Sequence, residues 1–123
     1  MKFLDNLAPH IHWLLRLSLG ATFIVHGLPK IPPDNFVQMS GLPVIVAWAV
    51  GLGEIAAGIT LIVGKFTDER VTRLGGLIVA IIMIGAIVLV HAKNGWNGSN
   101  GGMEFQVLML GVGLLFLTKG NKV

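Results

Sequence analysis

Five of the ionisable side chains inside or at the ends of the long apolar segments of this chain could take part in chemistry: Arg16, His26, Glu54, His91 and Glu104. A buried arginine and glutamate can form an ion pair, or they can handle a ligand or a proton. Two histidines and a carboxylate can bind a metal, relay a proton or hydrogen-bond a quinone-like head group. Which of these side chains meet depends on the elements that carry them.

The composition is typical of an integral membrane protein. Hydrophobic residues make up 54% and charged residues 12% of the 123 residues, whereas a soluble domain carries roughly twice that charge. The mean hydropathy is +0.79. Cysteine is absent, which excludes disulfides, iron–sulfur ligation and redox chemistry through the chain's own thiols. The net charge of +3 comes from scattered Lys and Arg and does not indicate nucleic-acid binding.

Four apolar segments predict an all-α, integral membrane four-helix bundle that forms a single transmembrane domain, residues 1–123. The segments cover residues 11–28, 42–63, 71–91 and 103–118. At about 1.5 Å per residue, the fourth spans only about 24 Å, less than the roughly 30 Å of the hydrocarbon core. A three-helix arrangement with a re-entrant fourth segment is the alternative.

The distribution of Lys and Arg predicts that both termini are cytoplasmic. In a four-helix chain, the N-terminus, the second connection and the C-terminus lie on one side of the membrane. They hold Lys2, Lys65, Arg70, Arg73, Lys119 and Lys122. The other two connections hold only Lys30 and Lys93 and would face outward.

Arg16 and Glu54 are predicted to form a buried ion pair. Arg16 is twelve residues from Leu28 on the first helix, and Glu54 is twelve residues from Leu42 on the antiparallel second helix. If both helices reach the same level, each charge lies about 18 Å from that end. The pair either fixes the helices structurally or takes a direct part in ligand or proton handling.

His26, His91 and Glu104 are predicted to share a plane near the outer end, because each lies close to the outer end of a different helix. The three could form a polar-ligand or proton site or a metal site, or they could only satisfy helix ends. Their spacing is not specific for metal, so no metal is assigned.

Small residues indicate where the helices touch, because they allow close backbone approach in membranes. Ala47, Gly51, Glu54 and Gly58 share one face of the second helix, and Gly76, Ala80 and Met83 share one face of the third. On the fourth helix, Glu104, Gly111 and Thr118 repeat every seven residues.

The chain resembles the DoxX family of small bacterial membrane proteins with four helices. The first helix carries R-L-x-L-G-x-x-F-x-x-H-G-x-x-K at residues 16–30. G-L-P follows at residues 41–43, and E-x-x-x-G with an aliphatic run at residues 54–63. An arginine-led third helix ending in His91 and G-x-E at residues 102–104 also fit. The match covers nearly the whole chain and keeps the order of the motifs.

This resemblance implies a protein of the bacterial cytoplasmic membrane, associated with quinone or other redox chemistry as a subunit of a membrane oxidoreductase system. The cofactor stays open, with a quinone as the candidate, and the implied partners are the lipid bilayer and either redox-complex proteins or further copies of the chain. Two other functions stay open: a non-enzymatic scaffold or assembly factor, and a small proton-coupled carrier.

Overall fold

The computed structural model describes residues 1–123 and consists of helices and their connections, without a β-strand. This confirms the all-α class. The α-helices are α1 (Lys2–Leu7), α2 (His12–Gly27), α3 (Asp34–Ser40), α4 (Val44–Val63), α5 (Glu69–Ala86) and α6 (Glu104–Lys119). A π-helical turn, Ile87–His91, extends α5. Short 3₁₀ turns cover Ala8–His10, Leu28–Lys30, Ala92–Asn94 and Gly98–Asn100.

Local sequence explains where the helices begin and end. Gly41 adopts a left-handed conformation, with φ of 72°, that ends α3. Asp68 caps α5 by accepting a hydrogen bond from the backbone N–H of Arg70 at 2.8 Å. Gly120, with φ of 59°, ends α6 and turns the C-terminal residues back toward the other helices. The four apolar segments of the sequence therefore become α2, α4, α5 with its π-helical turn, and α6.

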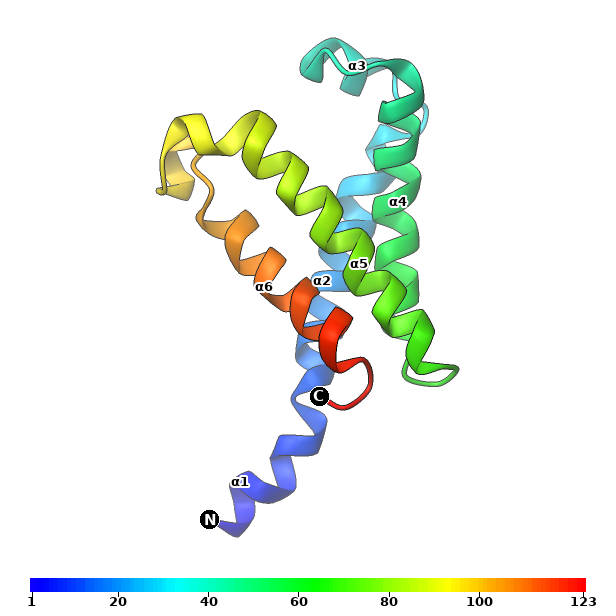
Figure 1. Cartoon of the computed structure of the whole chain (residues 1–123), viewed down its shortest axis with the longest axis vertical. Helices are drawn as coiled ribbons and strands as arrows, with labels where there is room; N and C mark the ends of the chain where they lie inside the picture. The colour runs from blue at the N-terminus through cyan, green and yellow to red at the C-terminus, as the bar shows by residue number, and fades with distance from the viewer.

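The helices pack as two antiparallel pairs, α2 with α4 and α5 with α6, which α4 and α5 join (Figure 1). The pairs diverge toward the end that holds α3 and the loop of residues 92–103, here called the α3 end. The opposite end, here called the C-terminal end, holds the α4–α5 connection and residues 120–123. Because α2 meets α6 over only a short stretch, the assembly is open on that side.

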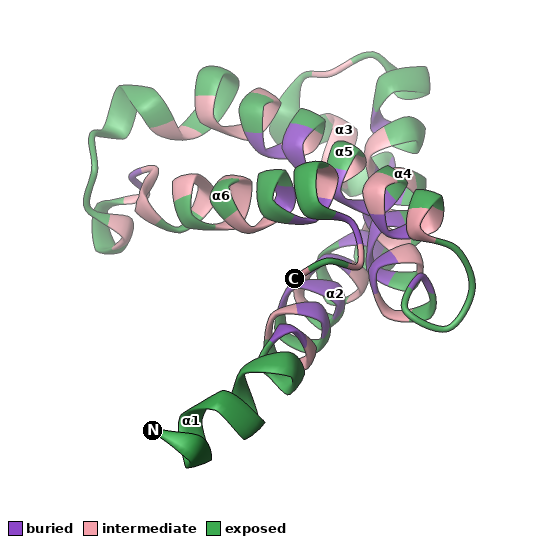
Figure 2. Cartoon of the chain, turned by 60° about the horizontal axis from the view of Figure 1, so that its bottom comes forward, coloured by how far each residue is buried: buried purple, intermediate pink, exposed green.

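Three helical stretches are long and apolar enough to cross a membrane: Lys2–Lys30, Val44–Val63 and Glu69–Asn94. Only 24 of the 123 residues are buried within the chain (Figure 2). The outward faces carry exposed Leu, Ile and Val, a distribution that suits lipid rather than water. At 16 residues, α6 is shorter than each of these three stretches.

Glycines set the register between α2 and α4. A Cβ on Gly27 would lie 2.8 Å from the carbonyl oxygen of Gly51, and one on Gly20 would lie 3.1 Å from that of Gly58. The backbones therefore touch at two levels, as small residues permit in membrane helices. The contact face predicted for the second helix is confirmed, because Ala47, Gly51, Glu54 and Gly58 are buried.

The contact face predicted for the third helix is also confirmed, with Gly76, Ala80 and Met83 buried. The face predicted for the fourth is wrong: Gly111 and Thr118 are exposed, and α6 buries Gly113 and Phe116 instead. Since α6 is apolar almost all round, its sequence does not distinguish the packed face from the lipid face.

Candidate functional site

A cavity of about 980 Å³ lies between the two helix pairs toward the α3 end. Its lining is mostly apolar, with contributions from α2, α4, α5 and α6 and from Phe36 of α3. The larger polar side chains on its wall are His26, Lys30, Glu54, His91 and Gln106. A mainly apolar pocket with a few polar groups is the usual form of a small-molecule site.

Lys30 and Glu54 form the charged part of the cavity wall. The Lys30 ammonium lies 2.8 Å from Oε1 and 3.0 Å from Oε2 of Glu54. The side chains are 20% and 7% exposed, so the pair is largely buried. The Lys30 nitrogen also lies 4.9 Å from the centre of the Phe36 ring, which links the pair to α3 by a cation–π contact.

The predicted Arg16–Glu54 ion pair is wrong. Arg16 is fully buried near the C-terminal end, where its guanidinium has no carboxylate partner. It donates to the carbonyl of Leu61 at 2.6 Å, to Oγ1 of Thr72 at 3.0 Å and to Nδ1 of His12 at 3.0 Å.

Asn121 completes the shell around Arg16. Its Oδ1 accepts hydrogen bonds from Arg16 at 2.8 Å and from Thr72 at 2.7 Å, and its Nδ2 donates to the carbonyl of Gly64 at 3.1 Å. The Phe116 ring lies 4.9 Å from the guanidinium carbon. These contacts join α2, α4, α5, α6 and the C-terminal residues around one cation.

The error in the pairing comes from the relative height of α2 and α4. The prediction placed Leu28 and Leu42 at one level, but the close approach of Gly27 to Gly51 shows that α4 starts higher. From Val44 to Gly51 is about two helical turns, or about 10 Å. Glu54 is therefore level with the end of α2, within reach of Lys30, and Arg16 is level with Leu61.

The three residues predicted to share an outer plane do not act as one cluster. His26 is exposed and lines the cavity, and His91 is half-buried and lines it too. Glu104 is not on the cavity wall; its Oε1 accepts a hydrogen bond at 2.7 Å from the backbone N–H of Gly98 and so holds the following loop. The three side chains form no group that could hold a metal ion.

His91 owes its position to the π-helical turn at the end of α5. A π-helix adds a residue to each turn, and such turns are frequent at functional sites. The Nδ1 atom of His91 lies 2.8 Å from the carbonyl oxygen of Gly101. That contact ties the end of α5 to the loop before α6. It uses only Nδ1 of the imidazole, so Nε2 takes no part in it.

Sequence reasoning missed Gln106 and the role of Lys30. Lys30 lies on the same face of the first helix as Arg16, so the motif indicated that both could face the second helix. The prediction paired Glu54 with Arg16 instead, because it placed the second helix at the wrong height. Gln106 carries a buried Oε1 with no hydrogen-bond partner. No pattern marks it in the sequence, because a single glutamine in an apolar helix resembles an interfacial residue.

Comparison with protein families matches DoxX over residues 11–92. The chain belongs to the DoxX family. The DoxX match includes α2, α4 and α5, and therefore most of the cavity wall. The chain is 33% identical over 101 residues to "Putative oxidoreductase CatD" of Bacillus subtilis (strain 168), covering 79% of this chain and 69% of that protein. No solved structure matches the chain.

As a DoxX protein with three helical stretches long and apolar enough to cross a membrane, the chain is a membrane protein. Its cavity offers an apolar lining for a ring or an alkyl chain, and polar groups at the α3 end for oxygen atoms. The Arg16 shell is chemically different, because its polar atoms are occupied by one another and leave little capacity for a ligand.

Proposed function

We propose that this DoxX protein binds a quinone-like head group in the cavity between the two helix pairs, as a redox-associated subunit of a membrane oxidoreductase system. The cavity of about 980 Å³, apolar except for a few polar groups near one end, is the observation that carries this proposal. The printed name of its relative from Bacillus subtilis, an oxidoreductase, agrees with the redox part.

The residues on the wall fit such a ligand. An apolar lining favours an aromatic ring and an alkyl tail, since these gain free energy on leaving water. Lys30 and the imidazole of His26 can donate hydrogen bonds to ring carbonyl oxygens, and the second ring nitrogen of His91 can accept one from a ring hydroxyl. A bound quinone would supply redox chemistry to a chain that has no cysteine, while the residues named here hold and orient it.

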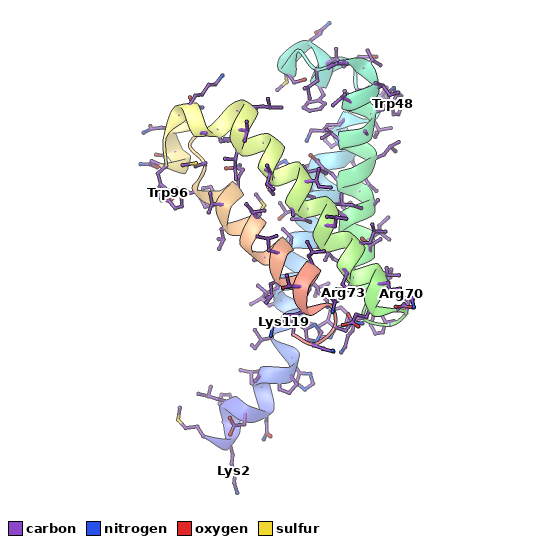
Figure 3. All side chains as sticks on the ribbon, in the orientation of Figure 1. Lys2, Trp48, Arg70, Arg73, Trp96 and Lys119 are labelled. Carbon is purple, nitrogen blue, oxygen red and sulfur yellow. The ribbon has the colours of Figure 1, made fainter.

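The proposal includes a topology. The chain forms one four-helix transmembrane domain in a bacterial inner membrane, with α6 as a short fourth span and both termini in the cytoplasm. In support, Figure 3 shows Arg70, Arg73 and Lys119 at the C-terminal end and Trp48 and Trp96 toward the α3 end. Basic residues favour the cytoplasmic side, and tryptophans favour the interfaces. The cavity would then open near the outer surface.

A matched pair of glycine variants tests the function. Gly85 lines the cavity, and a Cβ there meets no atom within 4 Å, so Gly85→Phe should fill the cavity without a clash. Gly111 is equally open but lies off the cavity, so Gly111→Phe is the control. Binding of decylubiquinone to purified protein in nanodiscs can be followed by tryptophan fluorescence. Saturable binding that Gly85→Phe abolishes and Gly111→Phe keeps is the expected result.

A scaffold or assembly factor is the second candidate, because the hydrogen-bonded shell of Arg16 uses intramembrane polar groups purely to join helices. Under this alternative, decylubiquinone does not saturate the protein, and Gly85→Phe leaves its cellular activity intact. A pull-down from native membranes would then recover a stoichiometric protein partner.

A further inference from the structure

Helix α1 (Lys2–Leu7) stands apart from the packed helices. None of its residues is buried, and it projects beyond the C-terminal end of the molecule (Figure 1). Three of its side chains are nevertheless large and apolar: Phe3 is 75%, Leu4 47% and Leu7 41% exposed. Such side chains gain free energy when they leave water, and the chain itself provides no apolar surface to cover them.

The membrane interface can be located from the residues at the start of α2. The Trp13 ring centre lies 5.3 Å from that of Phe66 in the α4–α5 connection, and Phe66 follows the exposed Lys65. Tryptophan and lysine at the end of an apolar helix are typical of the membrane interface. From Trp13 to Lys30 a helix rises about 26 Å, close to the roughly 30 Å of the hydrocarbon core. The chain from Trp13 onward therefore spans the core, and α1 lies outside it.

The apolar side chains of α1 share one face. At about 100° per residue, Phe3, Leu4 and Leu7 fall within a sector of about 100°, whereas Asp5 and Asn6 lie outside it. A helix with one apolar and one polar face is suited to lie in the plane of a membrane surface, with its apolar side chains at the boundary of the acyl chains.

Pro9 allows α1 to change direction relative to α2. It lies in the 3₁₀ turn Ala8–His10 and has no N–H to donate to a carbonyl one turn earlier. The hydrogen bond from the N–H of Ile11 to the carbonyl of Ala8 is long, at 3.4 Å. Helix α1 can therefore fold onto the membrane surface while α2 continues to span the membrane.

Charge indicates which lipid the surface should contain. Exposed cations gather at the C-terminal end and on α1, namely Lys2, Lys65, Arg70, Lys119 and Lys122 (Figure 3). Exposed carboxylates are fewer there, namely Asp5 and Asp68. Clusters of four to eight Lys or Arg beside a membrane helix attract anionic lipid headgroups.

We propose that α1 is an interfacial anchor that binds anionic phospholipid, with Phe3, Leu4 and Leu7 inserted at the boundary of the acyl chains. A second copy of the chain fits this face less well. Stable protein interfaces take about 20–30 residues from each side, far more than a six-residue helix supplies. The anchor is independent of the ligand that the cavity binds.

The test uses the absence of native cysteine to place a dye on either face of α1. Leu4→Cys and Asn6→Cys lie about 200° apart on the helix. Each is labelled with the fluorophore NBD in the full chain, and one copy per nanodisc is embedded in mixed phosphatidylcholine and phosphatidylglycerol. We expect acrylamide to quench the dye at Leu4 at least about threefold less than the dye at Asn6, because the lipid shields the apolar face. In phosphatidylcholine alone, the ratio should fall below about twofold.

A second variant checks that the apolar face causes the shielding. Phe3→Ser combined with Leu7→Ser, in the labelled Leu4→Cys protein, should raise quenching at Leu4 to the level at Asn6. The melting temperature should stay unchanged, because α1 has no buried residue.

Four results would overturn the proposal. Equal quenching at Leu4 and Asn6 in the anionic nanodiscs would show that α1 stays in water, and strong shielding of both would show that it enters the hydrocarbon core. Equal shielding of Leu4 in the two lipid mixtures would show that headgroup charge has no part in binding. Shielding that appears only with two copies per nanodisc would identify a second copy of the chain as the partner.

Discussion

The ammonium group of Lys30 contacts both carboxylate oxygens of Glu54, at 2.8 and 3.0 Å, and thereby joins the end of α2 to the middle of α4. Both side chains are largely withdrawn from the surface, yet they line the cavity. The pair therefore has two effects: it fixes the height of α4 against α2, and it places a paired charge next to any molecule in the cavity.

Breaking this pair should destabilise the protein. Lys30→Met or Glu54→Leu each leaves one charge without its partner, which costs about 3–5 kcal/mol in soluble proteins. Because side-chain couplings inside membranes are often smaller, we expect about 1–3 kcal/mol for each. The double variant should regain part of the loss, as measured by thermal unfolding in detergent. Strictly additive losses would show that the two residues are not coupled.

The pair between Arg73 and Glu69 is a control for that cycle. It has a similar distance, 3.1 Å, but its side chains are 37% and 38% exposed. Exposed pairs four residues apart on a helix contribute only about 0.3–0.5 kcal/mol. Glu69→Gln should therefore shift the melting temperature far less than Glu54→Leu does.

Replacing Asn121 should loosen the C-terminal end. Asn121→Ala removes the acceptor for Arg16 and Thr72 and the donor to Gly64, so three buried groups lose a partner. A loss of about 1–3 kcal/mol is expected, with faster proteolysis of the C-terminal residues. Lys122→Ala, on an exposed side chain one residue away, should stay within about 0.5 kcal/mol of the unaltered protein. Equal stability of both variants would argue against the Arg16 shell.

Two glycine-to-alanine variants should act in opposite directions. A Cβ on Gly58 would lie 2.5 Å from the carbonyl oxygen of Gly20 and from Cγ1 of Ile24, so Gly58→Ala forces α2 and α4 apart. Overpacking of this kind costs about 1–3 kcal/mol. A Cβ on Gly111 meets nothing within 4 Å, and alanine favours a helix by roughly 0.5–1 kcal/mol over glycine. Melting temperatures that move in the same direction would contradict this packing.

His26 and Glu104 should separate ligand binding from loop stability. His26→Ala removes an exposed side chain of the cavity wall and should weaken decylubiquinone binding with little change in melting temperature. Glu104→Gln weakens the hydrogen bond from the backbone of Gly98. It should speed amide exchange in the loop of residues 95–103 and keep the affinity for decylubiquinone. If Glu104→Gln weakened decylubiquinone binding and His26→Ala did not, the binding site would lie at the loop and not in the cavity.

The absence of native cysteine makes the topology directly testable. Thr67→Cys, Ser99→Cys and Lys122→Cys each place one thiol at an exposed position outside the long helices. With both termini in the cytoplasm, a membrane-impermeant maleimide should label only Ser99→Cys in intact cells. The other two variants should react after permeabilisation. Labelling of Lys122→Cys in intact cells would reverse the proposed orientation.

The sequence predicted the helices and two of the contact faces because both depend on local pattern. Apolar segment length marks the helices, and Gly51, Gly58 and Gly76 mark where backbones approach. Residue pairing could not be predicted in the same way. It depends on how far α4 slides along α2, and this shift of about two turns changes the neighbour of Glu54 from Arg16 to Lys30.

Two parts of the polar structure depend on the complete fold. Asn121 reaches Arg16 only because the chain reverses at Gly120, far along the sequence from α2. The Oε1 atom of Gln106 is buried without a hydrogen-bond partner, which no spacing of residues reveals. The sequence identified His26 and His91, which line the cavity, because ionisable residues are rare in apolar segments.

The π-helical turn at Ile87–His91 determines how this part of the chain responds to changes in length. It holds one residue more than an α-helical turn, so deleting one of residues 87–90 would let α5 continue as a regular helix, and the fold would tolerate the loss. Because the turn itself absorbs the extra residue, the residues on either side would keep their orientation, and His91 would stay on the cavity wall. Deleting one residue from the regular part of α5 would instead rotate the end of the helix by about 100° and carry His91 off that wall.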